Sequence, residues 1–407
     1  MRAADGAVVA ERPTIGLDLA PLRGPRTGIA NYTIHLVDAL LRRESDYRYV
    51  GFLGLREAEL GPAGVGWRVT GGGAEEAEAG ARRAAFLAGV AAALARHRAA
   101  RAAYRALERG LFPGQVSRWH LDLFHAFRFR PPCDPGVPVL PVVHDVSTFR
   151  HPEWHPRERV RWLDRLGDTI ARAPLVQTIS EFSKREIVDV FGVPAGRVFV
   201  APPAAAPVFA WRGEAASRRD LAALDLSYGG FLLTVGTLEP RKNLRTLVAA
   251  YLDLPRDARA RCPLVVVGGA GWGRLDLPRG TAALVAEGSL RFPCDVGDAQ
   301  LRSLYEGARV VLLPSHYEGF GMPAVEALAC GAAVVHSADT AMDEVTGGLA
   351  RRIAATDVAQ WTDALREAIA ADPAPDAAAR EARIAQARRF DWNESAASVL
   401  KAYAQLL

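Results

Sequence analysis

Cysteine and lysine are scarce in this chain, and no apolar run is long. The four cysteines lie far apart with no Cys-x-x-Cys pair, which argues against a disulfide framework and against a structural zinc site. No stretch approaches the roughly 18 uninterrupted apolar residues of a membrane-spanning helix. The N-terminal residues include Asp5 and Glu11 and have no apolar core, so we expect no signal peptide and a cytoplasmic protein.

What the chain does contain is typical of a folded protein with two domains. It has 407 residues, half of them hydrophobic, which excludes a disordered or collagen-like chain. Its formal charge of +4 is too small to require a nucleic-acid partner. Only three of its 50 basic residues are lysines, namely Lys184, Lys242 and Lys401. The position of each lysine is therefore informative.

Short apolar runs alternate with helical stretches along the whole chain, which predicts two α/β, Rossmann-like domains with parallel sheets. The expected strands of the first half are Thr14–Leu19, Tyr49–Leu53, Leu121–His125, Val139–His144, Leu175–Ile179 and Arg197–Ala201. Those of the second half are Phe231–Gly236, Leu264–Gly268, Leu290–Phe292, Val310–Leu313 and Ala333–His336. Because ligands bind beyond the carboxyl ends of such strands, a cleft between two facing domains is the expected site.

A segment rich in proline and alanine, followed by a polar stretch, indicates the domain boundary. We predict an N-terminal domain over residues 1–207, a linker over 208–228 and a C-terminal domain over 229–390. The last residues, 391–407, are predicted to form a helix that crosses back to the first domain.

Helices are expected over Ile29–Arg42, Glu158–Ala173 and Glu181–Phe191, the last with Ser180 as its N-cap. The stretch Ala81–Leu111 is predicted to form a further helix, which contains seven arginines and only one acidic residue. Two interpretations of it stay open. It is either a solvated crossover helix or an interfacial helix in peripheral contact with an anionic membrane. Its basic face is formed by Arg98, Arg101, Arg105 and Arg109.

The segment SHYEGFGMPAVEALACG follows the predicted strand Val310–Leu313. Glu318 precedes a helix that begins near Pro323, and Glu326 lies about one turn inside that helix. Free amide groups at a helix start attract phosphate or sugar oxygens, and two carboxylates there can hold hydroxyl groups. The Glu-x7-Glu spacing alone is weak, but the glycines, the proline and the preceding strand make the segment informative.

The segment TVGTLEPRKNL follows the first strand of the second half. Arg241 and Lys242 lie at the start of the next helix, where a cation opposes the helix dipole. A solvated pair is one interpretation. In a chain so poor in lysine we favour the other, in which the pair neutralises an anionic ligand such as a diphosphate.

These segments and the later Asp-Glu-Val at 343–345 resemble retaining GT-B glycosyltransferases of the large family 4. The likeness covers almost the whole chain and includes TGIANY (27–32), VVHDVSTFRHPEWHP (142–156), QTISEFSK (177–184) and the final Phe-Asp-Trp at 390–392. The segments of the first half are most similar to mannosyltransferases of bacterial polysaccharide and lipid-linked oligosaccharide assembly. The resemblance implies a GT-B fold, with two Rossmann-like domains facing each other across a cleft.

The resemblance also implies roles for particular residues. Arg241 and Lys242 would bind the donor diphosphate, Glu326 the ribose, and Glu318 the transferred sugar. His144 would touch that sugar as the active-site histidine, although a merely structural histidine is the alternative; His125 is better explained as structural. The remaining residues implied for donor binding are Gly28, Gly236, Val296, Gly319, Phe320 and Gly321. Gly28 has a plain turn glycine as its alternative, and His151, Trp154, His155 and Arg157 could shape an acceptor pocket or simply pack a loop.

The expected reaction is transfer of a sugar, most specifically mannose from GDP-mannose, to a glycan or lipid-linked glycan acceptor with retention. No Asp-x-Asp occurs in the chain, so we expect no metal and no cofactor, with Arg241 and Lys242 in the metal's place. A sugar-nucleotide epimerase of the same fold is one alternative. A non-catalytic sugar-nucleotide-binding protein is the other.

Overall fold

The structure is a computed structural model that describes residues 12–23, 27–61, 98–371 and 376–407. It divides into two compact units by packing. The first unit extends to residue 142 and includes 169–176 and 399–407, and the second contains 143–168 and 177–398. This grouping does not follow the boundary predicted near residue 207, which stays a prediction. Both units are of the predicted α/β class.

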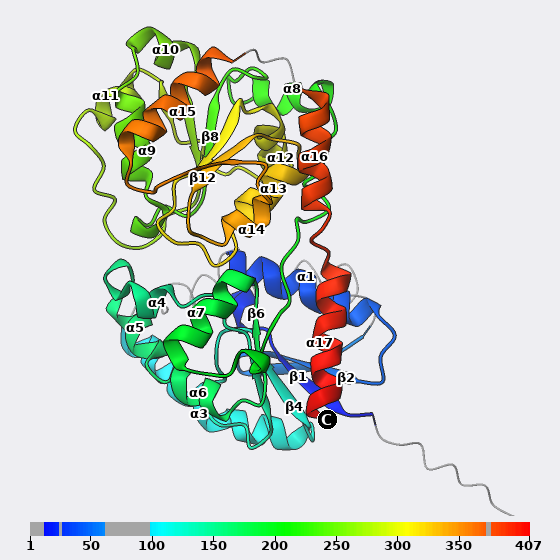
Figure 1. The fold of residues 1–407 in the computed structure, drawn as a ribbon. Coiled ribbons are helices and arrows are strands. Elements are labelled where there is room, and N and C mark those ends of the chain that lie inside the picture. The colour runs from blue at the N-terminus through cyan, green and yellow to red at the C-terminus, as the bar shows by residue number, and fades with distance from the viewer. Residues whose placement is uncertain (1–11, 24–26, 62–97, 372–375) are drawn as a thin grey trace, which may run out of the picture. The chain divides into compact units, whose positions relative to one another are not determined.

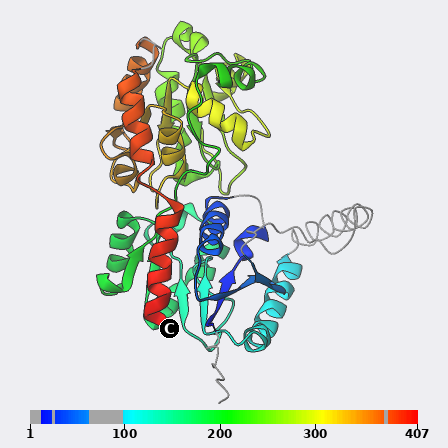
Figure 2. The ribbon, with the colours of Figure 1, turned by 90° about the vertical axis from the view of Figure 1, so that its right-hand side faces the viewer.

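The first unit contains a five-stranded sheet in the order β3-β2-β1-β4-β5. Its strands are β1 (Thr14–Asp18), β2 (Arg48–Leu53), β3 (Arg56–Leu60), β4 (Leu123–Ala126) and β5 (Val139–Pro141). Only β3 runs antiparallel, as the edge strand of a hairpin with β2. Helix α3 (Arg98–Arg118), cyan in Figure 2, places Phe112 and Val116 against Phe52 and Phe124 of the sheet. This aromatic contact buries one face of the first sheet.

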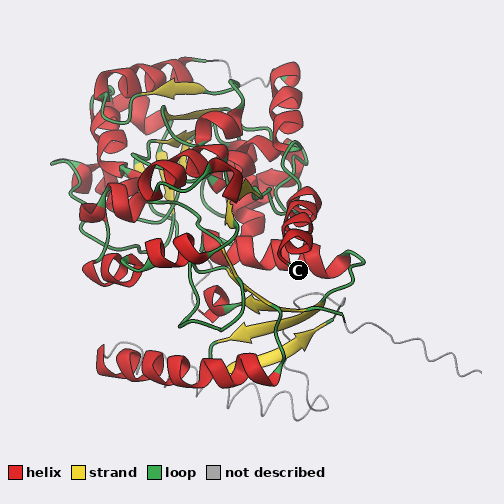
Figure 3. Ribbon diagram, turned by 60° about the horizontal axis from the view of Figure 1, so that its bottom comes forward, coloured by secondary structure: helices red, strands yellow, loops and turns green. Residues whose placement is uncertain are grey.

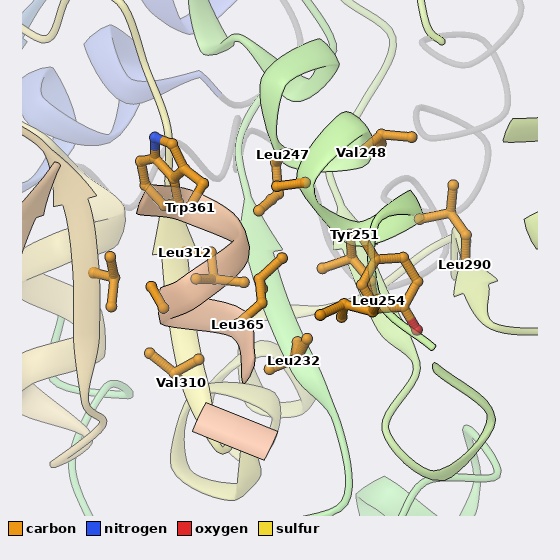
Figure 4. Packing of buried hydrophobic residues seen from close by; sticks show 14 of the residues in the cluster. Leu232, Leu247, Val248, Tyr251, Leu254, Leu290, Val310, Leu312, Trp361 and Leu365 are labelled. Atoms are coloured by element: carbon orange, nitrogen blue, oxygen red, sulfur yellow. The ribbon is translucent and has the colours of Figure 1, made fainter. Parts of the chain in front are cut away.

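The second unit contains a six-stranded sheet in the order β10-β9-β8-β11-β12-β13. Its strands, all parallel, are β8 (Leu232–Val235), β9 (Leu264–Val267), β10 (Leu290–Arg291), β11 (Val310–Leu313), β12 (Val334–Ser337) and β13 (Arg351–Ile353). Leu232 and Leu312 of the two middle strands are fully buried under Tyr251 and Trp361 from two helices (Figure 4). A sheet so buried explains the near-continuous apolar runs of its strands.

Helices border the strands, as Figures 1 and 3 show. Those up to the middle of the chain are α1 (Gly28–Arg42), α4 (Ser147–Arg150), α5 (Arg157–Leu163), α6 (Leu166–Arg172), α7 (Glu181–Phe191), α8 (Glu214–Ala222), the 3-10 turn η4 (Pro240–Lys242) and α9 (Leu244–Leu252). The later ones are α10 (Arg256–Arg261), α11 (Thr281–Ala286), α12 (Asp298–Gly307), α13 (Met322–Ala329), α14 (Met342–Thr346), α15 (Val358–Ala370), α16 (Ala377–Ala387) and α17 (Trp392–Leu406). Two short strands, β6 (Val176–Thr178) and β7 (Val198–Val200), pair in a separate sheet.

Helix α7 confirms a predicted cap. The Ser180 hydroxyl oxygen accepts a hydrogen bond from the Ser183 amide at 2.9 Å, so it satisfies one of the free donors of the first turn. The helix ends at Gly192, whose φ of +65° is the left-handed conformation that glycine adopts without strain.

Three local predictions need correction. The helix predicted over Glu158–Ala173 is two helices, α5 and α6, and no glycine or proline stands at the break to signal it. The strand predicted to end at His144 ends at Pro141, and β3 and β13 were not predicted. Residues 81–97 of the arginine-rich helix lie outside the described residues, while α3 covers the rest and continues to Arg118. In the described part of the chain, no helix combines the length and apolarity that a membrane crossing needs.

Candidate active site

The turn after β8 carries both predicted donor-site cations. Arg241 and Lys242 are the last two residues of η4, so they lie just before α9 rather than in its first turn. Asn243 follows with φ of +54°, and its Nδ2 donates to the carbonyl oxygens of Pro314 at 2.9 Å and Ala355 at 2.7 Å. These bonds tie the turn to the carboxyl edge of the sheet, where ligands of parallel sheets bind.

Glu318 lies beside these cations, although it comes from the loop after β11. Lys242 Nζ and Ser315 Oγ both donate to Glu318 Oε1, the serine at 2.7 Å, and Arg241 Nη1 donates to Oε2 at 3.3 Å. Burial by itself would raise the pKa of Glu318, but the charges of Lys242 and Arg241 together hold that pKa below its ordinary value. The buried carboxylate is therefore ionised and fixed in position.

The two cations differ in how many partners they have. Arg241 also donates to Glu239 Oε1, from Nε at 3.0 Å and Nη2 at 2.7 Å, and to the Tyr317 carbonyl oxygen at 2.9 Å. Among the described residues the side chain of Lys242 donates only to Glu318. An ammonium group has three donors, so Lys242 keeps donors for an anionic ligand, whereas Arg241 mainly positions Glu318.

Gly319 sits where the 315–321 loop meets the segment after β5. Its carbonyl oxygen accepts hydrogen bonds from the hydroxyls of Ser180 at 2.6 Å and Ser183 at 2.9 Å. A Cβ atom at Gly319 would lie 2.6 Å from the His144 carbonyl oxygen, so only glycine fits without a shift. The predicted residues His144, which is 5% exposed, and Glu318 are thus on two adjoining segments.

Phe320 and Gly321 complete the loop before α13. The Phe320 ring is buried edge-to-face against Phe390 at 5.3 Å, so only the backbone of this residue can face a ligand. Gly321 is the N-cap of α13 with φ of +96°, and a Cβ there would lie 2.6 Å from Met342 Cγ. Glycine is therefore required at this position for both conformation and space.

Glu326 lies inside α13 and has a different environment from Glu318. It is 7% exposed, and its Oε2 accepts a hydrogen bond from the hydroxyl of the buried Tyr305 at 2.9 Å. Burial without a cation raises the pKa of Glu326 to about 8, so this carboxyl group is mainly protonated at neutral pH. A neutral carboxyl group can both donate to and accept from a hydroxyl group.

Comparisons with known proteins identify the family of this chain. The family model "Glycosyl transferases group 1" matches residues 228–390, which contain both loops and α13. The chain is 35% identical to O-antigen chain mannosyltransferase B of Escherichia coli over 266 residues, which is 65% of this chain and 70% of that protein. The chain belongs to the glycosyl transferases group 1 family.

Solved structures show the fold of this glycosyltransferase. Sucrose-phosphate synthase from Thermosynechococcus elongatus superposes with a TM-score of 0.69 at 18% identity, covering 97% of this chain and 99% of that chain. HepE of Anabaena, solved in complex with UDP and glucose, has a TM-score of 0.66 at 15% identity, with 97% and 100% covered. The predicted GT-B fold is thereby confirmed.

The other predicted residues of the glycosyltransferase are placed as follows. A Cβ at Gly236 would touch the Lys242 side chain at 3.4 Å, so Gly236 lies beside the lysine stem. Val296 is half-buried in the turn before α12. Gly28 begins α1 in the first unit, with open space around its Cβ position. His125 Nδ1 shares a 2.7 Å hydrogen bond with the Tyr403 hydroxyl, which supports its structural interpretation. The donor-binding roles of Gly236, Val296 and Gly28 stay predictions.

Sequence reasoning missed several polar residues of this region. Asp145 accepts hydrogen bonds from the Ser147 amide at 2.9 Å and from the Ser147 hydroxyl at 2.6 Å. Burial by itself would raise the pKa of Asp145, but the charges of Arg241 and Arg159 hold that pKa below its ordinary value. Its position next to His144 was the available signal. Tyr305 gave no signal, because nothing in α12 marks it as the partner of a residue in α13. Within the described ranges, no group of three or more His, Cys, Asp or Glu side chains could hold a metal ion.

Proposed function

We propose that this glycosyltransferase moves a mannosyl residue from GDP-mannose to a glycan or lipid-linked glycan acceptor in polysaccharide biosynthesis, with retention at the anomeric carbon. The observation that carries the proposal is the contact of Lys242 with the buried, ionised Glu318 at the carboxyl edge of the second sheet. The choice of mannose and of a polysaccharide acceptor is supported by the similarity to the O-antigen chain mannosyltransferase.

In this proposal Lys242 stabilises the leaving group. Breaking the bond between the sugar and the diphosphate places negative charge on the departing oxygen, and a fixed cation next to it lowers the barrier. The ammonium group retains donors after its bond to Glu318, and the N-terminus of α13 adds amide groups that favour an anion. Activity should therefore survive treatment with EDTA.

Glu318 has a second task in the proposal. Its carboxylate is held by three donors, so it can accept from a hydroxyl of the transferred sugar without moving. The acceptor hydroxyl would attack from the face of the leaving group and give its proton to the departing diphosphate. No protein base is then required, and retention follows from the shared face.

The test is a transfer assay with the purified chain. Radiolabelled GDP-mannose and, in parallel, UDP-glucose and UDP-galactose are offered with mannose-containing oligosaccharides, with and without EDTA. The expected result is a mannosylated product with an α-configured anomeric carbon by NMR, equally abundant with EDTA. Product from a UDP-sugar only would contradict GDP-mannose as the donor, and an inverted anomeric centre would contradict retention. Activity restored only by Mn²⁺ or Mg²⁺ would contradict the metal-independent reaction. Epimer formation without acceptor would indicate the epimerase, and donor binding without any turnover would indicate a binding protein.

A further inference from the structure

His155 is a buried polar residue that the proposed reaction does not use. It follows a short 3-10 turn at Pro152–Trp154, and only 8% of the residue is exposed. Neither ring nitrogen has a hydrogen-bond partner among the described residues. Buried polar groups are nearly always hydrogen-bonded, and leaving one unpaired is unfavourable. Both ring nitrogens are also covered by neighbouring atoms, so a ligand could reach them only after the side chains around His155 move.

Trp272 and Arg159 form the surroundings of His155. The Trp272 ring lies 5.9 Å from the His155 ring, and the Arg159 guanidinium lies over the same tryptophan at 5.2 Å. Trp272 Nε1 donates to the Trp154 carbonyl oxygen at 2.9 Å, which fixes the tryptophan against this segment. The Arg159 guanidinium forms no ion pair or hydrogen bond with the described residues, although the charges of Asp145 and Glu239 act on it, so its N–H donors can bind another group.

This group adjoins the residues assigned to the donor sugar. Trp272 lies between two glycines whose added Cβ atoms would meet the turn after β8, Gly271 at 2.5 Å from the Leu238 oxygen and Gly273 at 2.9 Å from Pro240 Cγ. The next residue of that turn, Arg241, donates to Glu318. The loop with Trp272 is therefore packed onto the loop that positions the proposed sugar ligand.

The chemistry of His155 matches a hydroxyl group better than a phosphate. Burial and then the charge of Arg159 lower the pKa of His155 to about 4, so its ring is neutral at pH 7. A neutral imidazole has one N–H donor and one acceptor nitrogen. A sugar hydroxyl also donates and accepts, so it can satisfy either nitrogen, and the arginine can donate to a neighbouring oxygen.

We propose that His155 and Arg159 form a subsite that binds hydroxyl groups of a sugar ring and thereby sets which sugar the enzyme accepts. The proposal rests on the proposed function. The sugar has two sources, the acceptor and the transferred residue of the donor, and the kinetic experiment distinguishes them.

The experiment compares His155→Phe, His155→Gln and Arg159→Gln in the full chain. The control is His120→Asn, because His120 is exposed and its φ of +47° suits asparagine. KM is measured for a mannose-containing oligosaccharide and for GDP-mannose, and Kd for GDP, with thermal melting of every variant. Saturation-transfer NMR with methyl α-D-mannopyranoside in the presence of GDP reports sugar binding without turnover.

His155→Phe should raise one of the two KM values about tenfold or more and leave the Kd for GDP unchanged. His155→Gln, which keeps a donor and an acceptor, should cost less than Phe. A higher KM for the oligosaccharide assigns the subsite to the acceptor, and a higher KM for GDP-mannose assigns it to the transferred sugar.

Unchanged KM values in His155→Phe, or a weaker Kd for GDP, would overturn the subsite. If His155→Phe fails to fold, Arg159→Gln decides by the same criteria. A wild-type chain that transfers no sugar but shows His155-dependent saturation transfer would reject the proposed function and retain the subsite. Absence of both signals in the wild type would overturn both.

Discussion

The middle strands of both sheets end in buried charge clusters, and the two clusters differ in how their carboxylates are paired. After β1 and β4, Arg128 contacts Asp18 Oδ2 at 3.1 Å and Glu108 Oε1 at 2.9 Å, so two acids share one guanidinium, and Arg23 Nη2 lies 3.6 Å from the same Glu108 oxygen. Burial outweighs this shared cation and raises the pKa of Asp18 above its ordinary value. After β8 and β11, Glu318 has two cations of its own, and its pKa is lowered.

Two buried carboxyl groups can therefore have pKa values shifted in opposite directions, and the cations in contact with each one decide the direction. We name Asp18, Glu108 and Arg128 the first-sheet cluster, and Arg241, Lys242 and Glu318 the second-sheet cluster. In the first, the arginine is the shared partner that holds the acids in place. In the second, a lysine with spare donors lies beside a fixed carboxylate, which is what a site for an anionic sugar donor needs. Breaking each cluster should therefore affect different properties.

Lys242→Met should have the largest effect on activity. It removes a charge-assisted contact with the diphosphate, which is worth about 1.5–3 kcal/mol, so kcat/KM for the donor should fall roughly 10- to 150-fold. The matched control is Lys401→Met on the exposed side of α17, which should retain wild-type kinetics. Equal kinetics of the two variants would show that the second-sheet cluster is not the donor site.

Arg128→Met should destabilise the fold and leave the donor affinity unchanged. It removes the cation contact of the buried Asp18 and leaves Glu108 with only Arg23, 3.6 Å away, and breaking such a buried pair costs about 3 kcal/mol or more. Arg118→Met breaks an ion pair with Glu57 whose arginine is 70% exposed, and this should cost less than about 1 kcal/mol. Urea denaturation of both variants measures the difference; similar losses would mean that the first-sheet cluster contributes no more than a surface pair.

Glu326 sharpens the comparison, because it is buried and no cation of the described residues acts on its pKa. Its pKa of about 8 lies above that of the unfolded chain, so the unfolded state binds fewer protons between about pH 4.5 and 8. Its contribution to the free energy of unfolding is present below that range and is lost as pH rises, by at most about 1.4 kcal/mol per pH unit. Glu326→Gln should remove this loss, so the variant should gain stability relative to wild type between pH 5 and pH 7.5. Parallel stability curves for the two proteins would contradict the protonated state.

The smallest effect is expected on α3, where Arg105 and Arg109 are exposed. On α3, Leu107 and Leu111 are 51% and 48% exposed, next to Arg105 and Arg109. If this face contacts anionic lipid, each arginine near the surface contributes about 1 kcal/mol. Replacing the four arginines of the basic face by glutamine should weaken co-sedimentation with anionic liposomes, as should 1 M salt, which shortens the screening length to about 3 Å. Sedimentation that responds to neither change would leave α3 a solvated crossover helix.

The strand and loop motifs of the second unit could be predicted from sequence because they are local. The Ser180 cap and the loops after β8 and β11 follow from residues close together in the chain, and the structure places them as expected. Partners from distant elements could not be predicted. Nothing in the sequence showed that the Tyr317 carbonyl oxygen accepts from Arg241, or that Trp272 packs onto His155. The break between α5 and α6 could not be predicted for another reason, because the helical sequence pattern continues through it.

Isothermal titration of GDP into the wild type, Lys242→Met and Lys401→Met tests the central claim most directly. It asks whether the cation beside Glu318 is the one that binds the donor diphosphate. We predict binding to the wild type and to Lys401→Met with the same affinity, and at least about tenfold weaker binding to Lys242→Met. Equal affinities for all three proteins would contradict the account.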